Sequence, residues 1–549
     1  MNRKGKGCML GACMLCLGLG LTAQTPKGDP VIASASAAIV DTESGKLQGF
    51  IHGGMYAFRG VQYAKAERFM PPEKVPKWDG IKAALNYGCI SLMQLPAAPA
   101  GDDFFNPHRY WPQSDDCQFL NIWTPAIKDG KKRPVMVWIH GGGFENGSSI
   151  EQMAYDGENL SRKGDVVVIS LNHRLNAIGY LDLSAYGPEY KYSGNAGIMD
   201  LVAALQWIKG NIAQFGGDPG NVTLFGQSGG GGKILTLMAA PAAKGLFQKA
   251  IVESGTFAGM GPTLIKPETS RRVAAFTLQN LGLEANQVDQ LKTTPYDRLI
   301  EAANKARMQT AQEQGLKGPF GDVSLMWAPV VDGDYIPVEP AESEFAAQSK
   351  DIPLMIGTVL NEFTTIIVSD PAALESDNKN AWTKDEAKAA LEKKYGDKAD
   401  AVAKAFLSAY PDKKYADACF VDTLVRPATI RTARLKADQN GAPVYNYVFT
   451  WESPIMDGVG MAWHCSEIPF VFDNIALTET ASGGGKAAYA LSDKMSRAWV
   501  DFARSGNPND KNLPSWPAFS RSSGATMIFD DKCVVRYNHD AELMSLVAE

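Results

Sequence analysis

The pentad Gly-Gln-Ser-Gly-Gly at 226–230 constrains the fold of this chain more than any other stretch. It separates an apolar, β-rich segment at 222–225 from a segment at 233–238 that is typical of a helix. A strand that enters a helix through Gly-x-Ser-x-Gly turns so sharply that the outer two glycines have almost no room for a Cβ atom. The turn lifts the serine hydroxyl clear of the sheet and places the next N–H at the positive end of the helix. The pattern predicts Ser228 as a nucleophile, although an ordinary glycine-rich loop also fits the pentad taken alone.

Short apolar runs without polar alternation indicate further strands, buried on both faces of a parallel sheet. These runs lie at 134–139, 165–171, 222–225, 250–253, 354–360 and 444–449. Between the second and third of them, Ile198, Leu201 and Leu205 recur at helical spacing. Strands that alternate with helices predict an α/β fold, in which right-handed crossovers cover a mostly parallel sheet with helices on both sides.

Two segments interrupt this alternation. Residues near 262–310 and 382–440 are helical in pattern and rich in mixed charge. Strand-like runs of the same kind lie between and beyond them, so we expect both segments to be insertions over one sheet. The chain from 24 to 549 is therefore expected to form a single domain.

The N-terminus is typical of a secretory signal peptide. Arg3, Lys4 and Lys6 precede a short apolar run that ends at Ala23. The run is too short to favour a membrane-spanning helix, and no other stretch approaches the required length. We expect residues 1–23 to be removed and the mature protein to be exported. A lipoprotein box ending at Cys13 is the alternative, but the apolar segment ahead of it would be very short.

Net charge and cysteine spacing argue against nucleic-acid binding and metal binding. The net charge of −6 among 549 residues gives no electrostatic basis for binding nucleic acid. After residue 23, neither Cys-x-x-Cys nor His-Glu-x-x-His spacing occurs, so a metal site has little support. Beyond the signal segment five cysteines remain, an odd number, so at least one has no internal partner in an oxidising compartment. They are Cys89, Cys117, Cys419, Cys465 and Cys533.

A serine nucleophile needs a general base, and the chain has only six histidines. Five of them lie in the N-terminal β region, in irregular loops, ahead of the pentad or in the tail. His464 remains, in a loop after the strand predicted at 444–449. A lone histidine is usually structural, but this position favours catalysis.

The acid that orients the base should follow a strand between Ser228 and His464. Glu362 comes directly after the run at 354–360 and is the best placed candidate. Asp332 and Asp334 are more typical of a turn. The alternative for Glu362 is a plain surface carboxylate.

The glycines at 141–143, between His140 and Phe144, follow another predicted strand. Glycines at such a place let the backbone approach a substrate closely and point its amides at a developing negative charge. The N–H groups of Gly142, Gly143 and Gly229 are therefore predicted to form a three-donor oxyanion hole.

Four stretches together resemble the type-B carboxylesterases, the carboxylesterase/cholinesterase branch of the α/β hydrolases, including its bacterial para-nitrobenzyl-esterase-like members. They are 114–123, 140–144, 215–219 before the pentad, and the loop around His464. The resemblance runs from about residue 35 to 535. It implies an α/β-hydrolase fold and hydrolysis of small-molecule carboxylic esters through an acyl-enzyme, without a cofactor.

The resemblance also implies roles for individual residues. Cys89 and Cys117 match the first disulfide of the family, and Arg68 is expected to pair with Asp116 near its base. Ser254 stands where the family places a second serine near the triad.

Departures from the family pattern lie beside the nucleophile. Gln227 replaces the usual glutamate, Gly229 replaces the usual alanine, and Phe363 replaces a glycine often found after the acid. The loss of a carboxylate at 227 favours small to medium neutral esters over cationic ones. Lys233, five residues after the nucleophile, is unusual and the sequence leaves its role open.

Two other functions fit the same residues. One is a catalytically silent member of the fold that serves as a binding protein, although such proteins typically lack the serine or the histidine. The other is an amidase or lactonase with the same triad.

Overall fold

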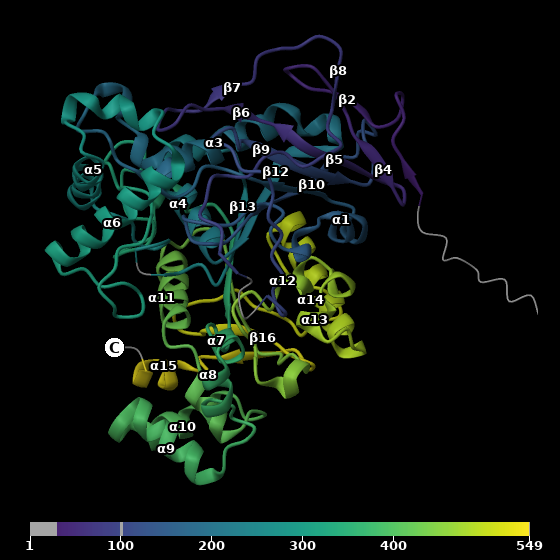
Figure 1. Cartoon of the computed structure of the whole chain (residues 1–549). Coiled ribbons are helices and arrows are strands. Elements are labelled where there is room, and N and C mark those ends of the chain that lie inside the picture. The colour runs from purple at the N-terminus through teal and green to yellow at the C-terminus, as the bar shows by residue number, and fades with distance from the viewer. Residues whose placement is uncertain (1–29, 99–102, 258, 548–549) are drawn as a thin grey trace, which may run out of the picture.

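The computed structural model of this protein describes residues 30–98, 103–257 and 259–547. The expected signal peptide at 1–23, with Cys13, lies outside these residues. A twelve-stranded sheet runs through the molecule (Figure 1). In spatial order its strands are β1 (Val31–Ile32), β4 (Phe50–His52), β5 (Met55–Gln62), β9 (Phe119–Thr124), β11 (Val167–Leu171), β10 (Arg133–Ile139), β12 (Gly217–Gln227), β13 (Lys249–Glu253), β14 (Leu354–Val359), β15 (Val444–Phe449), β16 (Ala525–Phe529) and β17 (Val534–Tyr537).

Neighbouring strands from β11 to β16 are all parallel, and the strands outside this block are antiparallel. Six of the strands in the parallel block are those that the apolar runs predict, and the seventh, β16, had no such prediction. In a parallel block the carboxyl ends of the strands meet at one edge of the sheet. The loops that follow β10, β12, β14 and β15 therefore gather at the same edge, although they are far apart in the sequence.

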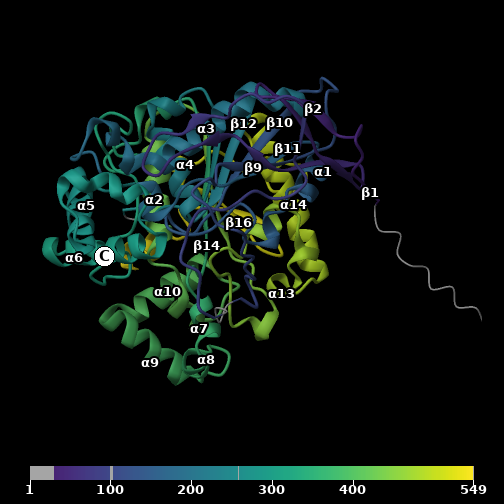
Figure 2. The same cartoon turned by 45° about the horizontal axis from the view of Figure 1, so that its top comes forward.

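Helices cover both faces of this sheet, as the alternation of strands and helices predicts (Figure 2). In β10, Val135 and Val137 belong to the core on one face, and Met136 and Trp138 belong to the core on the other. The central strands are mostly apolar because both of their faces are buried. The covering helices are α3 (Ala196–Asn211), α4 (Gly229–Ala239) and α11 (Val425–Asp438) on the first face, and α1 (Glu158–Gly164), α12 (Ile468–Val471) and α14 (Lys486–Ser505) on the second.

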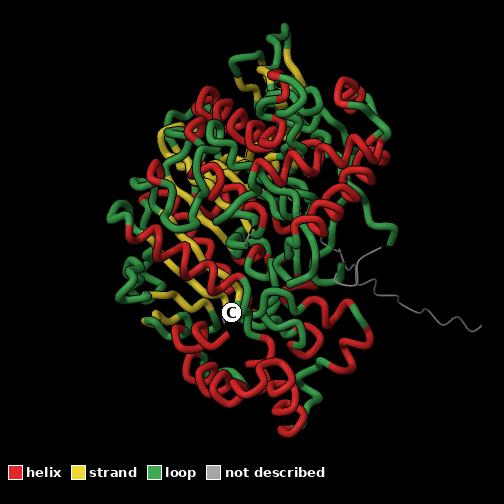
Figure 3. The backbone as a smooth tube through the Cα atoms, turned by 90° about the vertical axis from the view of Figure 1, so that its left-hand side faces the viewer, coloured by secondary structure: helices red, strands yellow, loops and turns green. Residues whose placement is uncertain are grey.

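Further helices lie outside these layers and are labelled in Figure 1, and Figure 3 shows helices around the strands that cross the molecule. The helices α5 (Pro267–Leu281) and α6 (Tyr296–Gln314) pack against each other, and α9 (Lys384–Tyr395) packs against α10 (Ala399–Ala409). The shorter elements are β2 (Ile39–Asp41), β3 (Lys46–Gln48), β6 (Ala64–Lys65), β7 (Glu73–Lys74), β8 (Ile81–Ala83), α2 (Asn176–Tyr180), α7 (Thr365–Ser369), α8 (Pro371–Ser376), α13 (Glu479–Ser482) and α15 (Ala541–Val547). Within the described residues, no helix has the length and apolar character needed to cross a membrane.

Two pairings expected in the N-terminal part are wrong in this structure. Cys89 and Cys117 are free thiols, and burial raises the pKa of the Cys117 thiol well above its usual range. Arg68 does not pair with Asp116. Its Nε donates to Asp115 Oδ1 at 2.6 Å, whereas Asp116 Oδ1 accepts a hydrogen bond from Gln62 at 2.8 Å. Because successive side chains in an extended segment point in different directions, a shift of one residue changes the partner.

Candidate active site

Ser228 occupies a strained turn between β12 and α4. Its backbone angles are φ 57° and ψ −126°, which few residues other than glycine adopt. The N–H of Ser228 donates to the carbonyl of Glu253 on the neighbouring strand β13 at 2.8 Å, which holds the turn in place. A Cβ atom at Gly230 would lie 2.0 Å from the Ile139 carbonyl oxygen, so the crowding predicted for the outer glycine is confirmed. Ser228 itself remains partly exposed.

The glycine loop after β10 lies against this turn. A Cβ atom at Gly141 would lie 3.4 Å from Ser228 Cβ, and one at Gly229 would lie 2.2 Å from the carbonyl oxygen of Gly143. Gly142 and Gly143 have φ of 76° and 61°, and within the described residues their N–H groups meet no hydrogen-bond acceptor. Gly229 is the first residue of α4, so its N–H has no partner within the helix. Three free backbone donors therefore lie beside the serine.

His464 and Glu362 contact each other across two loops, one after β15 and one after β14. His464 Nδ1 lies 2.5 Å from Glu362 Oε2, and the His464 N–H donates to the Glu362 carbonyl at 2.6 Å. The Glu362 carboxylate is completely buried, and its second oxygen accepts the N–H of Val359 at 3.3 Å. A proton on Nδ1 leaves Nε2 as an acceptor, which is the tautomer a general base needs.

Burial penalises the charged form of both groups. It raises the pKa of Glu362 well above its ordinary range, with the carboxylate of Asp422 acting in the same direction. It lowers the pKa of His464 to about 4, against the opposite influence of Asp422. The imidazole is therefore neutral at pH 7 and able to accept a proton.

Sequence reasoning missed Asp422, whose carboxylate accepts three backbone N–H groups at the start of α11. An aspartate just ahead of a helix is the signal that could have indicated it.

The other two predicted residues also lie at the histidine and its acid. Gln227 Nε2 is 3.1 Å from His464 Nε2, and the thiol of Cys465 donates to Gln227 Oε1 at 3.2 Å. An uncharged amide thus lies where the family pattern has a carboxylate. Ser254 is fully buried beyond the end of β13, and its hydroxyl lowers the pKa of Glu362 in opposition to burial.

The remaining histidines and the alternative acids are engaged elsewhere. His52 pairs with Glu158, His108 with Asp103, and His539 lies beside Asp540. His140 and His173 stack on each other, with ring centroids 5.0 Å apart. The carboxylate of Asp332 accepts the N–H groups of Asp334 and Ile336 and forms a turn. No group of three or more histidine, cysteine or acidic side chains in the described part of the chain is placed to hold a metal ion.

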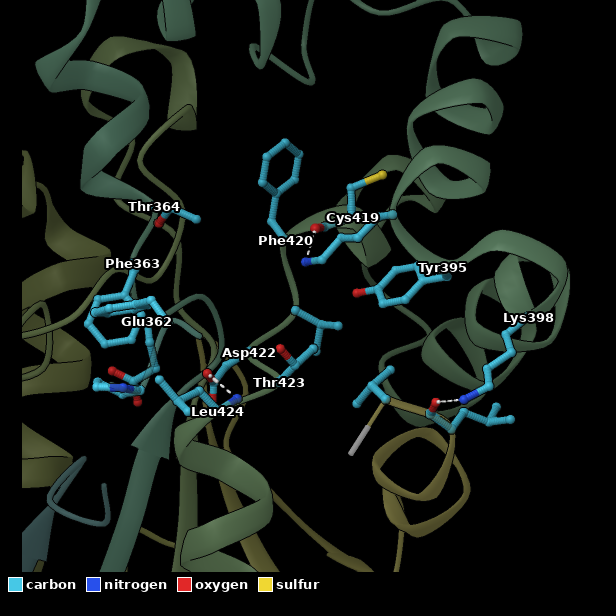
Figure 4. Close-up of a pocket in the computed structure, with 16 residues that line it drawn as sticks. Glu362, Phe363, Thr364, Tyr395, Lys398, Cys419, Phe420, Asp422, Thr423 and Leu424 are labelled. Carbon is cyan, nitrogen blue, oxygen red and sulfur yellow. Dashed lines mark hydrogen bonds between the residues drawn. The ribbon is translucent and has the colours of Figure 1, made fainter. Parts of the chain in front are cut away.

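A cleft of about 680 Å³ opens beside Glu362 (Figure 4). Glu362 and Phe363 line one side of it, and Tyr395 lies on the opposite side. The Phe363 ring also packs 5.3 Å from the His464 ring and 5.2 Å from that of Phe320. Aromatic surface therefore extends from the histidine into the cleft and suits an apolar part of a ligand.

The sheet, its helical layers and the strand–serine–helix turn define the α/β-hydrolase fold. The model of the carboxylesterase family matches residues 36–544, and the chain belongs to this family. It is 35% identical over 512 residues to a para-nitrobenzyl esterase of Bacillus subtilis, covering 92% of this chain and 97% of that protein. It is 34% identical to a phenmedipham hydrolase of Pseudarthrobacter oxydans, with 90% and 95% covered.

Solved structures agree with this assignment. An esterase from Clostridium hathewayi that can hydrolyse aliphatic aromatic polyesters superposes with a TM-score of 0.84 at 39% identity, covering 94% of this chain and 99% of that chain. A carboxylesterase of Geobacillus stearothermophilus superposes with a TM-score of 0.72 at 32% identity, covering 93% and 100%. This protein is accordingly a carboxylic ester hydrolase.

Proposed function

We propose that this protein is an exported serine esterase that cleaves small to medium neutral esters through an acyl-enzyme, with Ser228, His464 and Glu362 as its triad. The observation that carries the proposal is the 2.5 Å contact between Glu362 and His464, made by two loops that meet at the edge of the sheet where Ser228 is presented. Export is supported by the basic and apolar character of residues 1–23.

The proposed reaction proceeds in two halves. Ser228 Oγ attacks the ester carbonyl carbon while His464 Nε2 takes its proton, and Glu362 holds the imidazole and stabilises the imidazolium. The oxyanion accepts hydrogen bonds from the N–H groups of Gly142, Gly143 and Gly229. The tetrahedral intermediate then expels the alcohol, which receives the proton from His464. Water, activated by His464, hydrolyses the acyl-enzyme in the same way and releases the acid.

The surroundings of the serine support a neutral substrate. Gln227 presents an amide to His464 rather than a carboxylate, so no negative charge at this position attracts a cationic alcohol group. The sulfur of Met260 and the methyl carbon of Met326 lie 3.5 and 3.9 Å from where a Cβ of Gly143 would be, and Phe363 covers one side of the histidine. These apolar side chains suit acyl and alcohol groups without charge.

The proposal predicts the behaviour of three variants with p-nitrophenyl butyrate, a neutral activated ester. Ser228→Ala and His464→Ala should lose about 10⁴-fold or more in kcat, and Glu362→Gln about 10²- to 10⁴-fold, because each triad member acts through the others. Asp332→Asn, in the turn between α6 and β14, is the matched control and should keep full activity. A fluorophosphonate probe should label Ser228 in the unaltered enzyme and not in Ser228→Ala.

Two outcomes would contradict this assignment. Folded protein that the probe does not label would favour the silent binding protein. Unchanged turnover in Glu362→Gln would show that another residue acts as the acid of the triad.

A further inference from the structure

Lys233 is a completely buried lysine beneath the glycine loop. It lies on the second turn of α4, five residues after Ser228, and its Nζ donates to the carbonyl oxygen of His140 at 2.9 Å. A second, longer contact of 3.4 Å joins Nζ to the carbonyl oxygen of Gly141. A buried ammonium group is retained only where it makes compensating hydrogen bonds, and these carbonyls supply them.

The charge of Lys233 acts on the titratable groups buried around it. His140 and His173 stack at 5.0 Å, and burial together with the charge of Lys233 lowers the pKa of both well below the usual value, so both rings are neutral. Glu151 is the acidic group whose charge acts on Lys233 in the opposite direction. Burial lowers the pKa of Lys233 to about 7, so the ammonium titrates near neutrality.

The carbonyl of Gly141 belongs to the same peptide group as the N–H of Gly142. That oxygen accepts the Nδ1–H of His140 at 3.0 Å and faces the ammonium of Lys233 at 3.4 Å. Donors on the carbonyl side of a peptide increase the positive partial charge on its N–H, and a charged donor does so most strongly. Lys233 is thus electrostatically coupled to one of the three predicted oxyanion donors.

We infer that Lys233 is a positioning residue whose ammonium group holds the 141–142 peptide and strengthens the Gly142 N–H as an oxyanion donor. This inference rests on the proposed function, since it requires an oxyanion to form beside Gly142. It adds a buried cation that acts on the reaction through the backbone and touches no reacting atom.

The test compares Lys233→Met and Lys233→Gln with the unaltered enzyme on p-nitrophenyl butyrate. Lys233→Met should lower kcat about 10- to 100-fold with KM nearly unchanged, because an oxyanion contact is made only in the transition state. Lys233→Gln keeps a neutral donor and should recover only part of this loss. Lys436→Met is the matched control. Lys436 lies on α11 and is also fully buried, and its Nζ donates to the backbone carbonyl oxygen of Lys350 at 3.0 Å. It should keep the kcat of the unaltered enzyme.

The pH profile separates a charged role from a purely structural one. The ammonium is present below its pKa and lost above it, so kcat of the unaltered enzyme should fall as pH rises through about 7. Lys233→Met has no charge to lose and should show no such fall. Where Lys233→Met does not fold, Lys233→Gln carries the test, and a Lys233→Gln enzyme with the unaltered kcat would overturn the inference.

A Lys233→Met enzyme within twofold of the unaltered kcat would also overturn it. Fluorophosphonate labelling of Ser228 distinguishes this failure from failure of the proposed function. An unaltered enzyme that is labelled and active, with a fully active Lys233→Met, refutes only the role of Lys233. An unaltered enzyme that is neither labelled nor active refutes both.

Discussion

The protonation of His464 depends on its burial more than on its neighbours. The side chain is enclosed between Gln227, Glu362 and Phe363, and burial lowers its pKa to about 4. A base with a lowered pKa stays neutral in mildly acidic solution, so it can accept the proton of Ser228 over a wider pH range than a free imidazole.

We therefore predict that protonation of His464 lowers kcat/KM for p-nitrophenyl butyrate only as the pH drops through about 4, so a fall that begins at higher pH reports protonation of Glu362, whose pKa burial raises. The sign follows from the group: the protonated imidazole is inactive, and a lowered pKa moves its formation to lower pH. Circular dichroism at each pH checks that the fold persists. NMR titration of the imidazole in the folded protein checks its pKa directly, and a midpoint near pH 6.5 would show an imidazole with an unperturbed pKa.

At the scale of elements, the activity depends on how closely the loop after β10 approaches the turn between β12 and α4. Gly229 occupies the position that the family usually fills with alanine, and here the Gly143 carbonyl leaves no room for a Cβ atom. The two segments would have to move apart by several tenths of an ångström or more to accept one. The glycine therefore permits a tighter approach of the two segments than the usual residue would.

Gly229→Ala should lower kcat/KM by about 10- to 100-fold, because small displacements of oxyanion donors weaken transition-state contacts. The unfolding temperature should change much less than the activity. Gly485→Ala is the control, since a Cβ atom there meets nothing within 4 Å. A fully active Gly229→Ala would mean that the loop can withdraw without loss, and that its close approach has no catalytic role.

At the scale of the whole molecule, a buried ion pair joins the N-terminal segment to the parallel sheet and α3. Arg174 donates to both carboxylate oxygens of Asp200 at 2.8 and 2.7 Å, and both side chains are at most 1% exposed. The same guanidinium donates to the carbonyl oxygens of Glu67 and Met70. Removal of one partner would leave the other charge buried without compensation.

Asp200→Ala should destabilise the protein by about 3–5 kcal/mol, the usual effect of breaking a buried pair on one side. Asp438→Ala removes the partner of the exposed Arg521 and should change stability by no more than about 1 kcal/mol. Urea denaturation followed by tryptophan fluorescence measures both. Equal midpoints for the two variants would show that the buried pair contributes no more than a surface contact.

Much of the fold follows from sequence periodicity. The run 134–139 is apolar throughout, and 222–225 is apolar except for Thr223, because β10 and this part of β12 are buried on both faces. The pentad at 226–230 marks the passage of β12 into α4. The parallel sheet and its helical layers were therefore predictable. For the contact between Glu362 and His464, the sequence predicted only that both residues follow strands and that the acid precedes the histidine.

Other contacts had no signal in the sequence. Lys233 donates to His140, 93 positions away, and Arg68 pairs with Asp115 rather than Asp116. Local periodicity reports whether a residue is buried, but its partner depends on the direction in which each side chain leaves its own element. The sequence by itself determined the fold class, the strand-end positions of Ser228, Glu362 and His464, and the glycines beside them. Only the tertiary structure decided which buried groups surround them, because contacts between distant segments are set by packing and not by spacing along the chain.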